Sequence, residues 1–204
     1  MPLKRPKTLQ KNDLIRIVAP GSPFDKQDFL AGVATLKDWG FRVHYQKNVF
    51  EKKGYLAGDD KRRAQELSAA LNDPKAKAIL FARGGYGAMR LLPYLDKAQR
   101  KLSLKKPKII LGCSDVTCLL DSLHKKFGWP VFYGPHVTSA CLRDKGDIAS
   151  RDDFFQALTS TKPFGTKKFT DMKIIRHGKA IAPIIGGCLT LICATLGTPY
   201  EMNI

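Results

Sequence analysis

The residues best suited to chemistry in this chain form the segment Gly112-Cys-Ser-Asp, which carries Ser114. An apolar run at 109–111 precedes it and predicts a buried strand, and apolar residues at helical spacing follow it. A strand that turns directly into a helix places Ser114 at a sharp bend, as a nucleophile elbow does, although the usual second glycine is replaced by Val116. The alternative is that Ser114 or Asp115 only caps the helix.

A second segment, Arg83-Gly-Gly-Tyr-Gly, directly follows the apolar run 78–82. Its spacing fits neither the dinucleotide fingerprint nor a Walker A loop. Paired glycines allow close backbone approach and leave N–H groups free to point at an oxyanion. Beside a serine elbow, these donors and the N–H of Asp115 would hold a tetrahedral intermediate. The alternative is a turn that only needs a positive φ.

A serine nucleophile also needs a base, and the chain has 4 histidines. His44, on a predicted strand, and His124, on a helix surface, are interpreted as structural or solvated. His177 lies at the tip of a predicted hairpin. His136 follows a strand, and catalytic, substrate-binding and structural roles remain open for it. No pair of a histidine and an acid is placed well enough to complete a triad.

Strands and helices are expected to alternate four or five times through the first 160 residues. The predicted strands are residues 14–19, 41–45, 78–82, 109–112 and 131–133. This pattern indicates an α/β fold, a parallel sheet with helices on both faces. Sites in such sheets form outside the carboxyl ends of the strands. The loops 82–87, 112–115 and 134–136 should therefore lie on one edge, which favours the nucleophile interpretation of Ser114.

Local signals divide the rest of the chain. Ser22 followed by Pro23 predicts one helix start, and a capping box at 150–153 predicts another. Alternation over 172–185 predicts a β-hairpin, and an apolar run over 189–196 predicts a helix. We therefore predict an N-terminal α/β domain over 1–160, a linker over 161–170, and the truncated start of a second, β-rich α/β domain over 171–204.

Composition is ordinary for a globular protein, with 44% hydrophobic and 26% charged residues. No apolar stretch is long enough to span a bilayer and no secretory signal is visible, so a cytoplasmic location without membrane association is expected. The formal charge of +17 raises the question of nucleic-acid binding. The basic clusters are short, scattered and not interleaved with aromatics, so a solvated surface is favoured. The 5 cysteines contain no Cys-x-x-Cys pair and are interpreted as small buried residues in a reducing compartment.

Several motifs together resemble the LD-carboxypeptidase family of serine peptidases. In the family's order, and over nearly the whole chain, they are Ala19-Pro-Gly, Arg83-Gly-Gly-Tyr-Gly, Gly112-Cys-Ser-Asp-Val-Thr, Tyr133-Gly-Pro, Ile185-Gly-Gly-Cys-Leu and Gly197-Thr-Pro-Tyr. The resemblance implies that Ser114 is the nucleophile and that the backbone N–H groups of Asp115 and Gly85 form the oxyanion hole. It implies no metal and no cofactor.

Candidate substrate-binding residues are Arg83, Gly84, Tyr86 and His136. Arg83 would hold the terminal carboxylate of a peptide through its fork of donors, or would steady the loop through an ion pair. The implied reaction removes a C-terminal D-alanine from the L,D-peptide bond of murein tetrapeptide during peptidoglycan recycling. The alternatives are cleavage of the acyl-adenylate microcin C, as in a related branch of the family, or a non-catalytic peptide- or nucleic-acid-binding module. A homodimer is left open.

The sequence departs from the family's pattern in two places. Asparagine is usual where Cys188 stands. The family's catalytic glutamate and histidine belong to its C-terminal domain; Glu201 does not match that glutamate's motif, and no histidine follows His177. We therefore expect the Ser–His–Glu triad to be incomplete within these residues. Loss of the base lowers rates by about 10⁴ or more, so activity of this chain is expected to be absent or nearly so.

Overall fold

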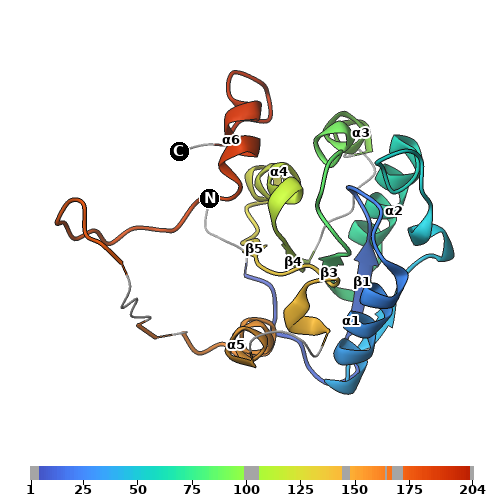
Figure 1. Cartoon of the computed structure of the whole chain (residues 1–204), viewed down its shortest axis with the longest axis horizontal. Coiled ribbons are helices and arrows are strands. Elements are labelled where there is room, and N and C mark those ends of the chain that lie inside the picture. The colour runs from blue at the N-terminus through green and yellow to red at the C-terminus, as the bar shows by residue number, and fades with distance from the viewer. Residues whose placement is uncertain (1–4, 99–105, 144–147, 164, 167–171, 203–204) are drawn as a thin grey trace.

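The computed structural model describes residues 5–98, 106–143, 148–163, 165–166 and 172–202. Its centre is a 5-stranded parallel sheet with the order β2-β1-β3-β4-β5 (Figure 1). The strands are β1 Leu14–Val18, β2 Arg42–His44, β3 Ala76–Phe81, β4 Ile109–Gly112 and β5 Phe132–Tyr133. The order reverses direction between β1 and β3, the place where ligand crevices form in open parallel sheets.

Helices cover both faces of this sheet (Figure 1). They are α1 Lys26–Asp38, α2 Asp60–Asn72, α3 Leu92–Ala98, α4 Thr117–Phe127, α5 Ile148–Thr159 and α6 Leu189–Thr195, with short 3₁₀ turns η1 Lys47–Phe50, η2 Met89–Leu91, η4 Ser114–Val116 and η5 Ala140–Leu142. Side chains of α1 and α5 pack on one face, and those of α2, α3 and α4 pack on the other. The predicted α/β architecture is confirmed.

Strand β3 shows why its sequence is an unbroken apolar run. Ala78 and Leu80 belong to the core on the α1/α5 side, whereas Ile79 and Phe81 belong to the core on the α2/α3/α4 side. All four side chains are at most 1% exposed. A strand covered on both faces has no position for a polar side chain, since successive residues point to opposite faces.

The prediction that Ser22 caps the first helix is wrong. The N-cap of α1 is Asp25, whose carboxylate accepts the N–H groups of Gln27 at 2.7 Å and Asp28 at 3.0 Å. The Ser22 hydroxyl is instead used by a distant loop, where it accepts the N–H of Tyr86 at 3.0 Å. Serine and aspartate are both good N-caps, so their types alone do not tell which of Ser22 and Asp25 caps α1. The contact of Ser22 with Tyr86 decides it.

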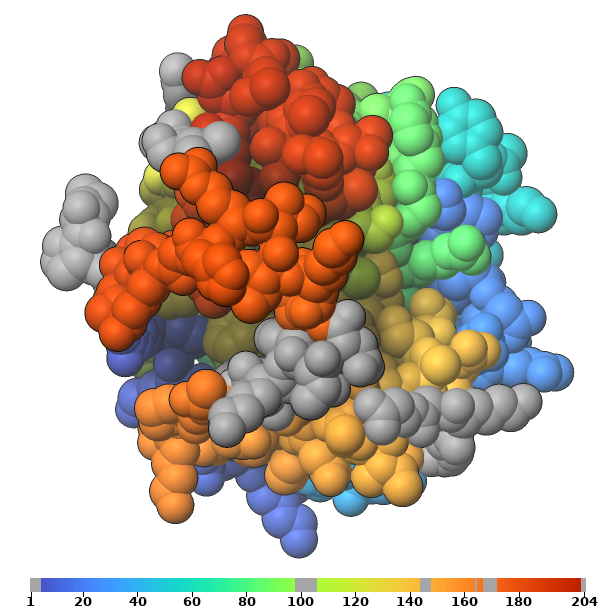
Figure 2. All heavy atoms as spheres, turned by 60° about the vertical axis from the view of Figure 1, so that its left-hand side comes forward, coloured from blue at the N-terminus to red at the C-terminus, as the bar shows by residue number. Residues whose placement is uncertain are grey.

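Two further local predictions are corrected. Helix α5 already includes Ile148, so Ser150 lies within the helix rather than at its N-cap. Residues 172–185 contain no strand; they run along the outside of the molecule as an extended segment (Figure 2). Ile175, Ile181 and Ile184 are between 94% and 100% exposed in this segment. An isolated hairpin is marginal in water unless one of its faces is buried, and no described residue covers these isoleucines.

The segment that follows packs beside α4 through α6 (Figure 1). Leu191 and Tyr200 are partly buried against the core, and the Tyr200 hydroxyl donates to the Asp96 carboxylate at 2.6 Å. The carboxylate of Glu201 accepts the N–H of Gly197 at 2.8 Å and so closes the turn after α6. The expected linker lies partly outside the described residues, and the domain boundaries remain predictions.

All 5 cysteines are free thiols. Cys118 and Cys141 are buried and Cys113 and Cys188 are half-buried, as small apolar residues would be, but Cys193 on α6 is exposed, contrary to expectation. Within the described ranges, no helix combines the length and apolarity needed to cross a bilayer.

The tight end of β4 provides a test of the packing. A Cβ on Gly112 would lie 2.5 Å from Cδ2 of Phe81 and 2.8 Å from Cγ2 of Val116. Gly112→Ala should therefore lower the free energy of unfolding by about 1–3 kcal/mol, measured by urea denaturation. Gly178→Ala is the matched control and should leave stability unchanged, because a Cβ on Gly178 would have no described atom within 4 Å. Equal stability of the two variants would contradict this packing.

Candidate active site

Ser114 lies at an elbow between β4 and α4. Its φ is +58°, in the left-handed region, and its side chain is exposed. The left-handed conformation costs an L-residue about 1–2 kcal/mol, so the surroundings must hold it. Neither η4 nor α4 has a side-chain cap, so the capping role considered for Ser114 and Asp115 is not found. Val116, at the position of the usual second glycine, is fully buried in the core.

Side chains hold both peptide groups of Ser114. Its N–H donates to the Tyr133 hydroxyl at 3.0 Å, and its carbonyl accepts the Thr117 hydroxyl at 2.6 Å. Thr117 Oγ1 in turn accepts the N–H of Cys188 at 3.0 Å. The serine is therefore fixed from β5 on one side and from α4 and the C-terminal segment on the other.

The carboxylate of Asp115 lies where three loops meet. It is only 3% exposed and accepts the N–H of Ala88 at 2.8 Å. A Cβ on Gly21, in the loop after β1, would lie 3.1 Å from this carboxylate. Burial raises the pKa of Asp115, while the N–H groups of Ala88 and Gly87 and the nearby Arg63 oppose the rise. The carboxylate thus ties the elbow to the glycine loop after β3.

The glycine loop approaches the elbow closely. Gly84 is buried, and a Cβ there would lie 3.2 Å from the backbone N of Asp115 and 3.3 Å from the Cys113 carbonyl oxygen. Gly85 has a φ of +86°, and a Cβ there would lie 2.4 Å from Ser22 Oγ. The N–H of Ser22 donates to the Gly84 carbonyl at 2.8 Å. Glycine is required at 85, and a side chain at 84 would be tightly crowded, because the loop is pressed between the elbow and the loop after β1.

Arg63 of α2 supports the same loops from below. Its guanidinium is fully buried and donates to the carbonyl of Gly87 at 3.0 Å, and also to the carbonyl of Pro20 and the carboxylate of Asp60. Burial lowers the pKa of Arg63, and its contact with Asp60 opposes this. The planar fork of donors suits a site that must bind two carbonyls from different loops.

Arg83 and Tyr86 lie on the exposed side of the glycine loop. The Arg83 guanidinium donates to the Pro23 carbonyl at 3.3 Å and forms no ion pair with any described residue. The loop-steadying ion pair considered for Arg83 is therefore not found among them, and most of its donors face solvent. Tyr86 packs edge-to-face against Tyr55, with ring centroids 5.4 Å apart.

His136 lies at the predicted edge, but its ring is buried and 8% exposed. Nε2 accepts the N–H of Cys113 at 3.3 Å, and the backbone N–H of His136 donates to Ser139 Oγ at 2.9 Å. Burial lowers the pKa of His136 to about 4, and the positive charge of Arg83 adds to this. The neutral ring therefore supports the residue before Ser114 through Nε2.

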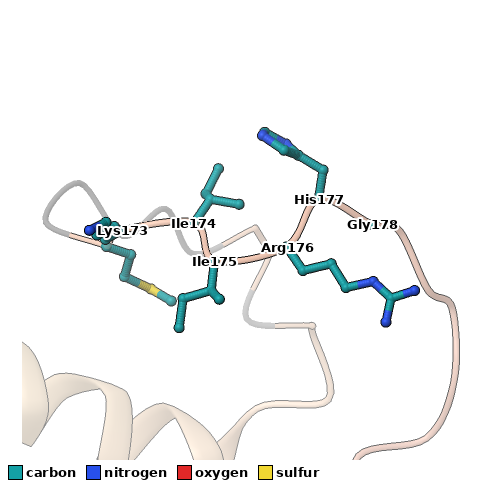
Figure 3. A pocket seen from close by; sticks show the side chains of 7 residues that line it. Lys173, Ile174, Ile175, Arg176, His177 and Gly178 are labelled. Atoms are coloured by element: carbon teal, nitrogen blue, oxygen red, sulfur yellow. The ribbon is translucent and has the colours of Figure 1, made fainter.

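The other histidines lie elsewhere. His44 is exposed on β2, and His124 makes a 2.7 Å hydrogen bond to the Trp129 carbonyl. His177 lies in a bend with a cavity of about 440 Å³ that is lined by residues 172–178 alone (Figure 3). None of these lining residues belongs to the loops that carry Ser114.

A larger cavity of about 930 Å³ lies beside α4 and borders the elbow through Tyr133. Its lining includes Leu120, Asp121, Val131 and residues 183–187. Burial raises the pKa of Asp121 to about 6. Within the described part of the chain, no group of three or more His, Cys, Asp or Glu side chains could hold a metal ion.

The site also contains residues that sequence reasoning did not select. Tyr133 and Thr117 occur only within motifs of the family resemblance, without a role, and Arg63 is not among the candidates. The position of Tyr133 at the end of a predicted strand, on the same edge as Ser114, was the one available signal. For Arg63 the one local signal was Asp60, three residues earlier on the same helix; its other partners, the carbonyls of Pro20 and Gly87, belong to distant loops.

The fold and the site define an α/β protein that presents an exposed serine on a strand-to-helix elbow, with a glycine loop against it. The sequence matches a family model described as the LD-carboxypeptidase N-terminal domain over residues 15–134. The chain belongs to this LD-carboxypeptidase family of serine peptidases. A Bacillus subtilis protein is 32% identical over 98% of this chain and 61% of its own length.

Other relatives represent two named activities. The murein tetrapeptide carboxypeptidase of Pseudomonas aeruginosa is 27% identical over 90% of this chain and 60% of its own length. The microcin C7 self-immunity protein MccF of Escherichia coli is 36% identical over 57% of this chain and 33% of its own length. The crystal structure of an MccF-like protein from Bacillus anthracis has a TM-score of 0.82 and 28% identity, covering 98% of this chain and 66% of that one. The chain thus spans less than two thirds of the length of these relatives.

The state of His136 can be tested through the pH dependence of stability. Because its pKa is about 4 when folded and about 6.5 in an unfolded chain, only the unfolded state binds this proton between those values. Stability should fall by about 3 kcal/mol as the pH drops from 6.5 to 4. His136→Gln, which keeps an acceptor for Cys113, should reduce this loss in urea denaturation, whereas exposed His44→Gln should not. Identical pH profiles for all three proteins would contradict a buried neutral ring.

Proposed function

We propose that this chain is the nucleophile-bearing part of an LD-carboxypeptidase-type serine hydrolase that acts on murein tetrapeptide. Ser114 Oγ attacks the carbonyl carbon of the L,D-peptide bond. The developing oxyanion accepts hydrogen bonds from the N–H groups of Asp115 and Gly85. The C–N bond then breaks, and D-alanine leaves with its amine carrying the proton that the Ser114 hydroxyl has lost. Water releases the shortened peptide from the serine ester.

The observation that carries this proposal is the exposed, left-handed Ser114 against the glycine loop. The N–H of Gly85 has no acceptor among the described residues, so it is available to a ligand. The family and the name of the Pseudomonas relative support an L,D-peptide as the substrate. Donors fixed in advance around a nucleophile are what acyl transfer requires.

We further propose that these 204 residues bind the peptide without turning it over. A general base must reach the Ser114 hydroxyl, and His136, which lies on the same edge of the sheet, has its Nε2 occupied by the Cys113 N–H. A serine without its base retains only the catalysis that the oxyanion donors and binding provide.

Measurements of peptide binding and of turnover test two claims separately: that murein tetrapeptide is the ligand, and that this chain does not hydrolyse it. Calorimetry should show that murein tetrapeptide binds the wild type and Ser114→Ala equally well. An otherwise identical peptide ending in L-alanine is the stereochemical control and should bind less tightly. Release of D-alanine should stay about 10⁴-fold below that of a complete LD-carboxypeptidase. Absence of binding would contradict the substrate; fast release that Ser114→Ala abolishes would contradict the inactivity.

Arg83 should bind the terminal carboxylate of the peptide. Arg83→Ala should weaken tetrapeptide binding about tenfold to hundredfold, since hydrogen bonds between charged groups contribute about 1.5–3 kcal/mol. Arg42→Ala is the matched control, because Arg42 is also exposed and donates to one backbone carbonyl, at 2.8 Å. A tetrapeptide with a C-terminal carboxamide should not respond to Arg83→Ala. If Arg83→Ala weakens binding of the carboxamide peptide as much as binding of the carboxylate peptide, Arg83 does not bind the terminal carboxylate.

A second candidate is cleavage of a microcin-type acyl-adenylate, favoured by the similarity to MccF and to the MccF-like structure. MccF has been crystallised with aspartyl sulfamoyl adenosine. Displacement of tetrapeptide by this compound would favour the second candidate, and tetrapeptide binding that the compound leaves unchanged would favour the first.

A further inference from the structure

Ser114 has a conformation that its own residue type does not prefer, so its neighbours decide where its hydroxyl points. Its φ of +58° is one of two positive values among the non-glycine residues that the structure describes. The other, Asn12, belongs to a type that tolerates this region well. Serine has no such advantage, which makes the hydrogen bonds of Ser114 informative.

Tyr133 provides the bond to the N–H of Ser114. The donor nitrogen and the phenol oxygen are 3.0 Å apart, an ordinary length for a well-formed hydrogen bond. The sheet fixes the tyrosine in register: Tyr133 pairs with Gly112 across β4 and β5, and the N–H of Gly134 donates to the Gly112 carbonyl at 3.0 Å. The phenol is therefore carried by the strand next to the nucleophile's own strand.

The ring of Tyr133 lies partly in solvent at the edge of the sheet. The residue belongs to β5, the edge strand next to β4, and is 52% exposed. A core aromatic would bury its ring, whereas this one keeps its ring at the rim of the cavity beside α4 and directs its oxygen at the Ser114 backbone. The contact between Tyr133 and the elbow is therefore made by its hydroxyl, which accepts the Ser114 N–H.

Because the Ser114 N–H is already bonded to Tyr133, it is not one of the donors that could bind an oxyanion. A tyrosine oxygen that accepts this N–H removes it from any bound oxyanion. The anion must then be held by the donors that follow the serine and by the glycine loop. The same bond resists rotation of the Ser114 peptide plane toward the ordinary α region.

We infer that Tyr133 is a positioning residue that holds the Ser114 backbone in its left-handed conformation through the phenol oxygen. The inference rests on the proposed role of Ser114 as nucleophile, but the hydrogen bond can be tested separately. Tyr133→Phe removes one oxygen and keeps the ring. Tyr94→Phe is the matched control: Tyr94 is 42% exposed on α3 and its hydroxyl has no hydrogen bond among the described residues.

The first measurement is amide hydrogen exchange at Ser114 by ¹⁵N NMR. Loss of one hydrogen bond should accelerate exchange about fivefold in Tyr133→Phe, without a change in global unfolding. Tyr94→Phe should exchange like the wild type. If the Ser114 amide of Tyr133→Phe exchanges at the wild-type rate, the inference is wrong.

The second measurement is the rate at which an alkyl fluorophosphonate modifies Ser114. Tyr133→Phe should slow this modification about tenfold, Tyr94→Phe should not, and Ser114→Ala should abolish it. Unaltered modification of Tyr133→Phe would contradict positioning even if exchange accelerates. A wild type that is never modified would agree with a serine that lacks its base. The exchange result alone would then decide whether the tyrosine holds the backbone.

Discussion

The geometry of the site depends on one buried carboxylate, that of Asp115. It accepts the N–H of Ala88 and belongs to the residue after Ser114, so the elbow and the glycine loop cannot move apart without exposing a charge that has lost its donors. On the far side of the same loop, Arg63 binds the Gly87 carbonyl. The loop therefore lies between a buried anion and a buried cation. The raised pKa of Asp115 shows that these partners do not fully offset its burial.

Much of this arrangement could be predicted from the sequence, because parallel strands place their following loops on one edge. All five strands lie where the sequence predicted them, four from apolar runs and β2 from alternation over 41–45, and the glycine pair and Ser114 followed from their positions after β3 and β4. The partners of the backbone could not be predicted. Whether Tyr133 reaches Ser114 depends on the register of β5, and whether Arg63 points inward depends on how α2 packs on the sheet. Neither is a property of local sequence.

The failed local predictions have the same origin. The hydroxyl of Ser22 was expected to cap α1, but it is used by Tyr86, 64 residues away. His136 lies on the expected edge, yet its ring faces inward, because Cys113 offers an N–H and the space behind Gly84 admits a ring. The alternation at 172–185 describes a face that would be buried in a sheet, and no described residue covers it. The sequence pattern locates these residues, but their conformation and partners depend on tertiary contacts.

The hydrogen bonds through Thr117 have a consequence for evolution by recombination. Its hydroxyl receives the N–H of Cys188 and gives its own proton to the Ser114 carbonyl, so a peptide from the C-terminal segment is two bonds away from the serine. A Cβ on Gly187 would lie 2.4 Å from Cγ2 of Thr117, which leaves little freedom at this junction. A chimera that joins this N-terminal part to a foreign C-terminal part must therefore keep a glycine at 187 and a backbone N–H at 188 wherever it keeps Thr117. A larger residue at 187 would push against Thr117 and so shift the serine that Thr117 holds.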